Sequence, residues 1–252
     1  MKAIIYFILM LIPCAAVAQV DAVGNKEVGD SAYAKGDYQA AIEAYQAILA
    51  DNSISPEIYY NLGNAYYKTS EIGKAILNYE RALLLDPSDE DIRFNLELAR
   101  SKAVDKVDDG FKLFLTEWIE TLVNVASLGT WAVIAIVTFV VMLIALLLLF
   151  FGKSIALRKA SMWCSVVMLI ITLFSNYAAM SHYSKLTSKE MAIIMSPTVT
   201  AKSTPDNSGT NLFEIHEGRK VKVCDDSMKE WKEIELEDGT VGWIPASALE
   251  VI

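Results

Sequence analysis

Few side chains in this 252-residue chain are of types and spacings that could carry out catalysis. The two histidines, His182 and His216, lie far apart in the sequence, and no His-Cys-Asp cluster, paired-acid motif or metal-ligand spacing accompanies them. Acid–base and nucleophilic catalysis need such groups within hydrogen-bond reach of one another. We therefore expect a protein that is not an enzyme and that holds no cofactor or metal.

One short motif imitates a nucleotide site. Gly152-Lys153-Ser154 has the form of the end of a phosphate-binding loop, but that loop also needs a glycine five positions before the glycine-lysine pair. Leu147 stands there, inside an apolar stretch. The sequence therefore predicts no nucleotide binding.

The charge of the chain limits its partners. The formal net charge is −9, and residues 19–110 contain 17 acidic and 9 basic side chains. Nucleic acids and anionic headgroups both attract basic patches. An acidic surface argues against these partners; it indicates solubility, with a basic partner as the weaker alternative.

The first apolar block has the layout of a secretory signal peptide, residues 1–18. Lys2 precedes a stretch of ten apolar residues, Pro13 interrupts it, and Ala16-Val17-Ala18 supplies a cleavage site. Ten residues are too few to cross a bilayer, which takes about 20. An uncleaved anchor and a lipidated Cys14 are the alternatives. With Cys14 removed and Cys164 in an apolar block, we expect Cys224 to be a plain strand residue without a disulfide.

Two further apolar blocks predict transmembrane helices at 131–151 and 162–180. The second contains Ser165, Thr172, Ser175 and Asn176, whose polar groups we expect to face the first helix rather than lipid. Residues 152–161 form a short loop with three basic side chains and no acid, which is typical of a cytoplasmic loop. The signal peptide independently exports the N-terminal region, so both soluble regions are predicted to face the periplasm of a bacterial inner membrane.

Residues 110–124 read as an amphipathic helix. Apolar residues recur at helical spacing from Phe111 to Val123, and Lys112, Glu117 and Glu120 lie on the opposite face. We expect this helix to lie in the membrane interface. Packing against the preceding domain is the alternative.

Residues 22–104 repeat with a period of 34. Gly29 recurs as Gly63, Ala41 as Ala75, Tyr45 as Tyr79 and Leu49 as Leu83. The second unit follows the tetratricopeptide pattern, with small residues where helices cross closely and Pro87 ending the second helix. Two repeats and a capping helix near 88–104 are fewer than the three units that such arrays usually need. We infer that a partner, a second copy or the amphipathic helix completes the array.

Repeats of this kind bind peptides or other repeats in a concave groove lined by their first helices. By repeat position, the predicted protein-binding residues are Lys26, Tyr33, Tyr60, Asn64, Tyr67 and Lys68, with Asp30 beside them. Grooves that clamp a C-terminal carboxylate use several basic residues. Asp30 and Asp91 occupy the matching positions here, which argues against that ligand.

Residues 191–252 alternate apolar and polar side chains in short runs separated by turns. Strands are predicted near 192–195, 198–202, 211–216, 219–224, 231–236 and 240–244, which indicates a small barrel. Trp231-Lys232 and the ending Gly242-Trp243-Ile244-Pro245 resemble bacterial Src-homology-3 domains. The resemblance implies a ligand surface that includes Trp231 and Pro245. Ala248 stands where proline-peptide binders have a tyrosine, and cell-wall peptides are the other ligand that the resemblance implies.

The predicted fold is a multidomain membrane protein with an all-α tetratricopeptide repeat, two transmembrane helices and a small all-β Src-homology-3-like barrel. This order of domains resembles the BatE family of the aerotolerance operon of Bacteroides-type bacteria. The resemblance implies a protein-interaction scaffold whose partners are membrane and periplasmic proteins, including other products of the operon. The alternative is a membrane protein that senses or binds peptidoglycan.

Overall fold

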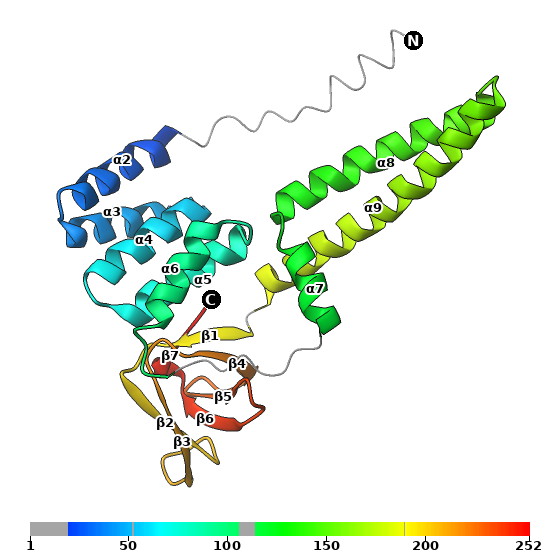
Figure 1. Cartoon of the computed structure of the whole chain (residues 1–252). Coiled ribbons are helices and arrows are strands. Elements are labelled where there is room, and N and C mark those ends of the chain that lie inside the picture. The colour runs from blue at the N-terminus through cyan, green and yellow to red at the C-terminus, as the bar shows by residue number, and fades with distance from the viewer. Residues whose placement is uncertain (1–19, 52, 106–113, 189) are drawn as a thin grey trace.

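The computed structural model describes residues 20–51, 53–105, 114–188 and 190–252. The predicted signal peptide and residues 110–113 of the predicted amphipathic helix lie outside the described residues. Three parts follow one another along the chain: a helical region, a hairpin of two long helices and a C-terminal sheet (Figure 1). This order of helices and antiparallel strands confirms the coarse fold expected from the sequence.

Five helices form the first part: α2 (Val20–Ala34), α3 (Tyr38–Ala50), α4 (Pro56–Lys68), α5 (Ile72–Leu85) and α6 (Glu90–Arg100). Polar side chains begin three of them. Asp37 accepts from the backbone N–H of Ala40, Ser55 from that of Ile58, and Asp89 from that of Ile92. These caps satisfy N–H groups that have no partner within the helix, and so fix where α3, α4 and α6 start.

Glycines let paired helices approach closely. A Cβ placed on Gly63 would lie 2.7 Å from Cε1 of Tyr79, and one on Gly29 would lie 2.5 Å from Cε1 of Tyr45. Both tyrosines are 1% exposed. The sequence prediction that small residues recur where helices cross is confirmed, since only glycine leaves room for the rings.

Helix α6 differs from the helix that it repeats. Tyr59, Leu62, Gly63 and Tyr66 of α4 face α5, where their neighbours include Lys74, Tyr79 and Arg81. The residues 34 positions later are Arg93, Leu96, Glu97 and Arg100. Of these, Leu96 is buried, whereas Arg93 and Glu97 are exposed. This face therefore suits solvent and ion pairs rather than a further close-packed helix.

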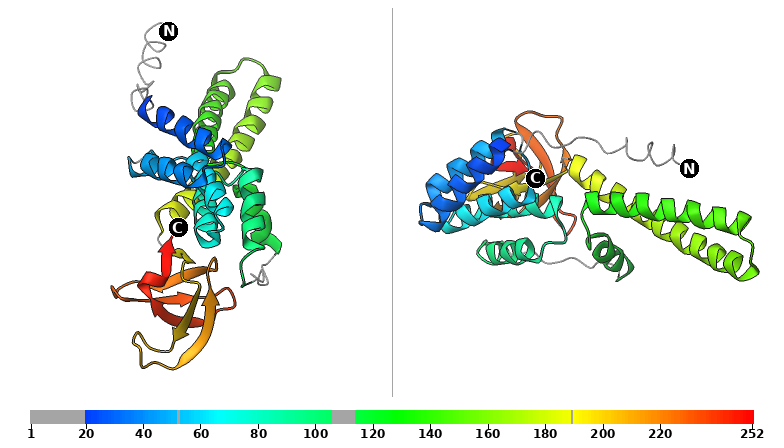
Figure 2. Two further views of the ribbon diagram at one scale, coloured as in Figure 1. Left: turned by 90° about the vertical axis from the view of Figure 1, so that its left-hand side faces the viewer. Right: turned by 90° about the horizontal axis from the view of Figure 1, so that it is seen from above.

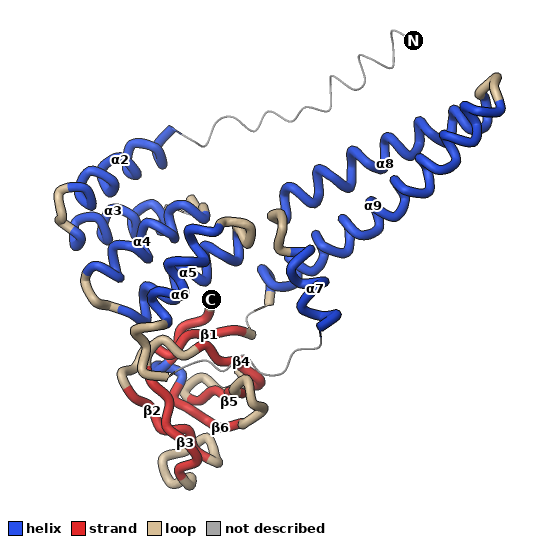
Figure 3. The backbone as a smooth tube through the Cα atoms, viewed as in Figure 1, coloured by secondary structure: helices blue, strands red, loops and turns tan. Residues whose placement is uncertain are grey.

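The C-terminal part is a seven-stranded antiparallel sheet (Figure 3). Its strands are β1 (Met191–Ile194), β2 (Thr198–Lys202), β3 (Asn211–His216), β4 (Lys220–Asp225), β5 (Trp231–Glu235), β6 (Val241–Pro245) and β7 (Leu249–Val251), in the order β3-β2-β6-β5-β4-β1-β7. A 3₁₀ turn, Ala246–Ala248, precedes β7. The sheet encloses a core that includes Ala192, Ile194, Ile234 and Ile244. Alternate residues of β2, β4 and β6 are buried, as the alternating sequence predicts.

This sheet packs against helix α5, so the first and third parts form one body (Figure 1). Ile193 of β1 is fully buried in the core of the helical region, and Met195 and Ile252 pack beside it. The turn between β3 and β4 reaches the start of α5, where the Glu217 carboxylate accepts the backbone N–H of Gly73 at 2.9 Å. Glu71, the N-cap residue of α5, makes no side-chain cap, so Glu217 supplies it from the other domain.

A buried carboxylate forms an ion pair across the same interface. Glu80 of α5 is 6% exposed and pairs with Arg100 of α6 and, at 2.7 Å, with Lys220 of β4. Nearby, both oxygens of Asp105 accept from His216, one from its backbone N–H at 2.7 Å and one from Nδ1 at 2.8 Å. The sheet of the same chain covers this side of α5. The inference that a partner, a second copy or the amphipathic helix completes the array is therefore wrong for this side of α5.

Helices α8 (Leu128–Phe151) and α9 (Ile155–Thr187) form a hairpin that projects away from this body (Figure 2). Both are long and apolar enough to span a membrane, and only 6% and 17% of their most apolar windows are buried within the protein. A core helix of a soluble protein would instead be mostly buried. Because α9 begins at Ile155, the predicted loop 152–161 is short: Arg158 and Lys159 lie on the first turns of α9.

Polar side chains join the two helices of the hairpin. Ser165, Thr172 and Ser175 are buried between them, and the Thr172 and Thr138 hydroxyls lie 2.8 Å apart. The prediction that these groups face the first helix is confirmed for the three hydroxyls and is wrong for Asn176. That side chain is exposed and donates to the backbone carbonyl of Thr172, four residues earlier on its own helix.

Helix α7 (Phe114–Val123) meets the hairpin at its base. The Val123 carbonyl accepts from the indole N–H of Trp131 at 2.8 Å, and Nε2 of His182 lies 3.0 Å from it. Trp118 is 58% exposed and Ile119 is 38% exposed, so these apolar side chains of α7 are not covered by the helical region. The position of this helix in the membrane interface stays a prediction.

The Glu80 interface yields a test of stability. Replacing Glu80 with glutamine leaves Arg100 and Lys220 facing each other without their anion. We expect a loss of about 2 kcal/mol in the free energy of unfolding, somewhat less than for a fully buried pair because both cations are partly exposed. Chemical denaturation of the full chain in detergent measures it. Glu97→Gln, at an exposed carboxylate of α6, is the matched control and should change stability by less than about 0.5 kcal/mol. Equal effects would show that Glu80 does not join the domains.

Candidate functional site

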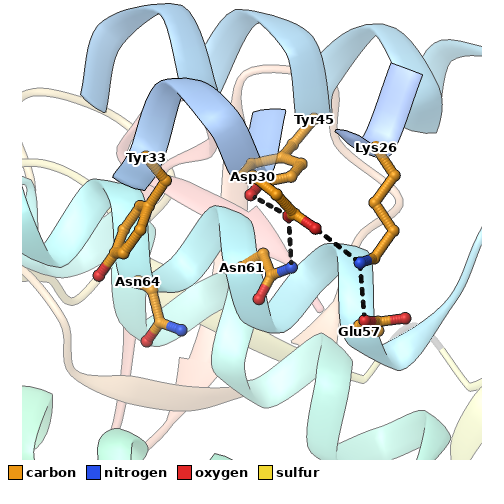
Figure 4. Close-up of a pocket in the computed structure, with 7 residues that line it drawn as sticks. All are labelled: Lys26, Asp30, Tyr33, Tyr45, Glu57, Asn61 and Asn64. Carbon is orange, nitrogen blue, oxygen red and sulfur yellow. Dashed lines mark hydrogen bonds and ion pairs between the residues drawn. The ribbon is translucent and has the colours of Figure 1, made fainter. Parts of the chain in front are cut away.

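Two neighbouring cavities follow the side of the helical region formed by α2, α4 and α6. The first, about 260 Å³, is lined by Lys26, Asp30, Tyr33, Tyr45, Glu57, Asn61 and Asn64 (Figure 4). The second, about 270 Å³, is lined by Tyr33, Tyr60, Asn64, Tyr67, Lys68, Tyr79, Asn95 and Leu98. Because Tyr33 and Asn64 line both, the two cavities form one continuous surface, called the groove below.

Asp30 organises the first cavity. Its carboxylate accepts from Nζ of Lys26 at 2.7 Å, from the Tyr45 hydroxyl at 2.7 Å and from Nδ2 of Asn61 at 3.3 Å. Lys26 also reaches Glu57 at 2.9 Å. Figure 4 shows the ammonium group between the two carboxylates, with the Asn61 amide beside them. One cation is therefore shared by two anions.

These contacts set the protonation states of the cluster. Burial raises the pKa of Asp30, but the hydrogen bonds from Lys26 and Tyr45 outweigh it and hold that pKa below its ordinary value. The hydrogen bonds to Asp30 and Glu57 raise the pKa of Lys26. Burial, and then the bond to Asp30, raise the pKa of the Tyr45 hydroxyl far above its usual range. All three groups keep their ordinary charges at neutral pH.

Amides organise the second cavity. The Tyr79 hydroxyl donates to Oδ1 of Asn64 at 2.7 Å, and Nδ2 of Asn95 donates to the same oxygen at 3.0 Å and to the Tyr60 hydroxyl at 2.9 Å. These bonds join α4, α5 and α6. They fix the direction in which the Asn64 amide and the Tyr60 ring are presented, which is the pre-organisation that binding surfaces use.

The structure brings together the six groove residues predicted from the sequence. Lys26 lines the first cavity, Tyr60, Tyr67 and Lys68 line the second, and Tyr33 and Asn64 line both. Asp91, in contrast, is exposed at the start of α6 and lines neither cavity. The role of the six groove residues in binding stays a prediction.

Sequence reasoning identified Tyr45 and Tyr79 only as repeat equivalents, and it missed four further lining residues, Glu57, Asn61, Asn95 and Leu98. Two of them carried a signal, because Asn95 is the repeat equivalent of Asn61, 34 residues later. An asparagine at one position of two successive first helices indicates a shared role.

The sheet domain has its own hollow. Trp231 lines an open depression of about 600 Å³, and the other lining residues are Pro205, Asp206, Asn207, Met228, Lys229 and Glu230. Pro245 is the cross-strand partner of Trp231 but does not line the hollow. Trp243 is half-buried, paired with Lys202 and Glu233 on the neighbouring strands. The two predicted ligand residues are therefore adjacent, with only Trp231 facing the depression.

Within the described ranges, no three His, Cys, Asp or Glu side chains are placed to hold a metal ion. The two histidines are engaged in contacts already described, His216 with Asp105 at the domain interface and His182 with the Val123 carbonyl at the base of the hairpin. What the groove offers instead is aromatic surface, fixed amides and one charged cluster.

Comparison with known proteins identifies the helical part. The tetratricopeptide repeat family matches residues 28–91. TPR repeat-containing protein MJ1428 of Methanocaldococcus jannaschii is 30% identical over 107 residues, which are 41% of this chain and 19% of that protein. The chain thus spans about a fifth of the relative's length. The helical region is a tetratricopeptide repeat, and such repeats mediate protein–protein interactions in proteins that are in general non-catalytic adaptors.

The two phenols of the groove allow a paired test. Tyr45 and Tyr79 are repeat equivalents, but Tyr45 donates to a carboxylate and Tyr79 to an amide. We expect Tyr45→Phe to cost about 2 kcal/mol of unfolding free energy and Tyr79→Phe about 1 kcal/mol at pH 7, because bonds to charged groups are stronger.

The difference between these variants should depend on pH. The pKa of Asp30 is lowered in the folded state, so its stabilising contribution is present above its unfolded pKa and is lost as the pH falls through the folded value. Urea unfolding at neutral and acidic pH checks this. A difference that is absent at pH 7, or that grows in acid, would contradict the assignment.

Proposed function

We propose that this protein is an inner-membrane scaffold that presents its repeat groove and its sheet domain to protein partners. The observation that carries the proposal is the groove itself, a continuous surface of aromatic rings and fixed amides on a tetratricopeptide repeat. The sheet domain docks on α5, so both binding surfaces belong to one body that connects to the α8–α9 hairpin.

The orientation follows from two cues in the sequence. The signal peptide at 1–18 exports the repeat domain, 22–104, and the basic residues Lys153, Arg158 and Lys159 hold the tip of the hairpin in the cytoplasm. Both soluble domains then face the periplasm. In this arrangement the exposed Trp118 and Ile119 of α7 lie in the membrane interface, as amphipathic helices do.

We further propose that residues 191–252 are a Src-homology-3-like barrel whose ligand surface contains Trp231 and Pro245. Supporting this, the two residues are cross-strand partners and a 3₁₀ turn follows Pro245. The order of domains supports a BatE-like role in an aerotolerance or stress-related membrane complex of the Bacteroides type. Its partners would be other products of the same operon.

Cell-wall binding is the alternative function. It draws on the Trp231 hollow, which offers one aromatic ring and Lys229 but also two acids, Asp206 and Glu230. A basic or aromatic lining would favour a wall peptide, whereas this mixed lining does not. The scaffold is therefore the better supported proposal.

Removing groove side chains tests the scaffold. Tyr67→Ala combined with Lys68→Ala should abolish recovery of specific membrane proteins in a mild-detergent pull-down from native membranes, because both side chains line the second cavity. The control, Lys35→Ala with Glu43→Ala, changes exposed residues outside the groove and should retain the partners. If both variants recover the same proteins as the wild type, the groove does not bind them. Recovery of cell-wall fragments alone, lost on deletion of 191–252, would support the alternative.

A native thiol tests the orientation. Cys224 is exposed on β4, and burial and its contact with Glu235 raise its pKa, so labelling is best done at mildly alkaline pH. With Cys14 and Cys164 replaced by serine, a membrane-impermeant maleimide should label Cys224 in cells whose outer membrane alone is permeabilised. A cysteine placed at Lys153, in a chain that also carries Cys224→Ser, should react only after lysis. The reverse pattern would place the sheet domain in the cytoplasm.

A further inference from the structure

The groove changes character along its length. At one set of equivalent positions the residues are Lys26, Tyr60 and Phe94; at another they are Asp30, Asn64 and Leu98. The first helix thus supplies charge, the second supplies polar aromatic and amide groups, and the capping helix supplies apolar side chains. Phe94 is 66% exposed and Leu98 is 39% exposed, which extends the apolar end beyond the second cavity.

The charged end carries an excess of anions. Lys26 is held by both Asp30 and Glu57, so one cation faces two carboxylates. A carboxylate of a ligand would have to displace these two anions and remain beside them. A cation, in contrast, would restore neutrality and find carboxylates already positioned by Tyr45 and Asn61. Glu57 is 62% exposed, so it is accessible to such a group.

We propose that the groove binds an extended protein segment with a basic side chain at the Asp30–Glu57 end and an apolar side chain among Tyr33, Tyr60, Tyr67 and Leu98. This proposal rests on the proposed function of the groove and adds the chemistry of its ligand. The cavities, about 260 and 270 Å³, are each below or near the lower limit for a drug-sized ligand and suit single side chains. Lys26 then acts as an internal competitor that occupies the site when no ligand is bound.

Substitution of Lys26 tests the proposal, because it should change the affinity in opposite directions for a basic and an acidic ligand. If the ligand is basic, Lys26→Ala vacates the carboxylates and strengthens binding by about twofold to fivefold, the range expected for one partly exposed charge pair. If the ligand is acidic and uses Lys26, the same substitution weakens binding. Lys74→Ala is the matched control, because Lys74 also pairs with a carboxylate, Glu71, but lines neither cavity.

The probes are fluorescent peptides, capped at both ends, in a glycine–serine frame. Each carries one leucine and, one to four residues away, one arginine, glutamine or glutamate. Fluorescence anisotropy with the full chain in detergent measures their affinity. We expect the best arginine peptide to bind about tenfold more tightly than its glutamate counterpart and to weaken as salt is added. Glu57→Gln, which removes the charge of one of the two carboxylates, should reduce binding of the arginine peptide.

Several results would overturn the inference: a preference for glutamate, weaker binding of the arginine peptide by Lys26→Ala, or no binding by any peptide of the set. These results would not contradict the proposed scaffold function as long as Tyr67→Ala with Lys68→Ala still removes partners from the pull-down. If that double substitution has no effect, in contrast, both the scaffold function and the ligand proposed for its groove are contradicted.

Discussion

The arrangement of this protein depends on the two ion pairs of Glu80, one within the helical region and one across the domain interface. A carboxylate that is 6% exposed is costly to bury alone, so its burial at this interface depends on the pairs with Arg100 and Lys220. One cation comes from the capping helix and the other from the sheet. The same interface buries Ile193 and places Glu217 at the start of α5. A short repeat array, which exposes a large apolar area at its ends, thereby gains the covering surface that a third repeat would otherwise provide.

The repeat region and the groove were predictable because they rest on local, periodic signals. Gly63 and Tyr79 recur from Gly29 and Tyr45 at one spacing, and the helix geometry then places the first-helix residues on one side. All six predicted groove residues line the two cavities. Their charges could not be assigned from spacing alone, because the pairing of Lys26 with both Asp30 and Glu57 depends on side-chain directions in two different helices.

The docking of the sheet was not predictable, because it joins residues about 140 positions apart. Its only signals are ambiguous by themselves: a glutamate within an apolar helix, a glycine at its second position, and charged residues where α4 has tyrosines. Each is also typical of a solvent-exposed surface. The orientation of Asn176 was mispredicted for a related reason, since a helical asparagine can bond its own backbone and need not face a neighbouring helix.

The charged face of α6 has a consequence for how long the protein's complexes last. Because Arg93, Glu97 and Arg100 replace the residues that would receive another helix, the array ends there and the groove cannot lengthen. A segment bound over so short a surface buries little area, as in the small interfaces of transient complexes. In the proposed membrane setting, tethered partners stay close together and rebind at a high effective concentration. The closed array thus favours short-lived contacts that form again repeatedly. The fraction of grooves that are occupied then depends more on confinement in the bilayer than on intrinsic affinity.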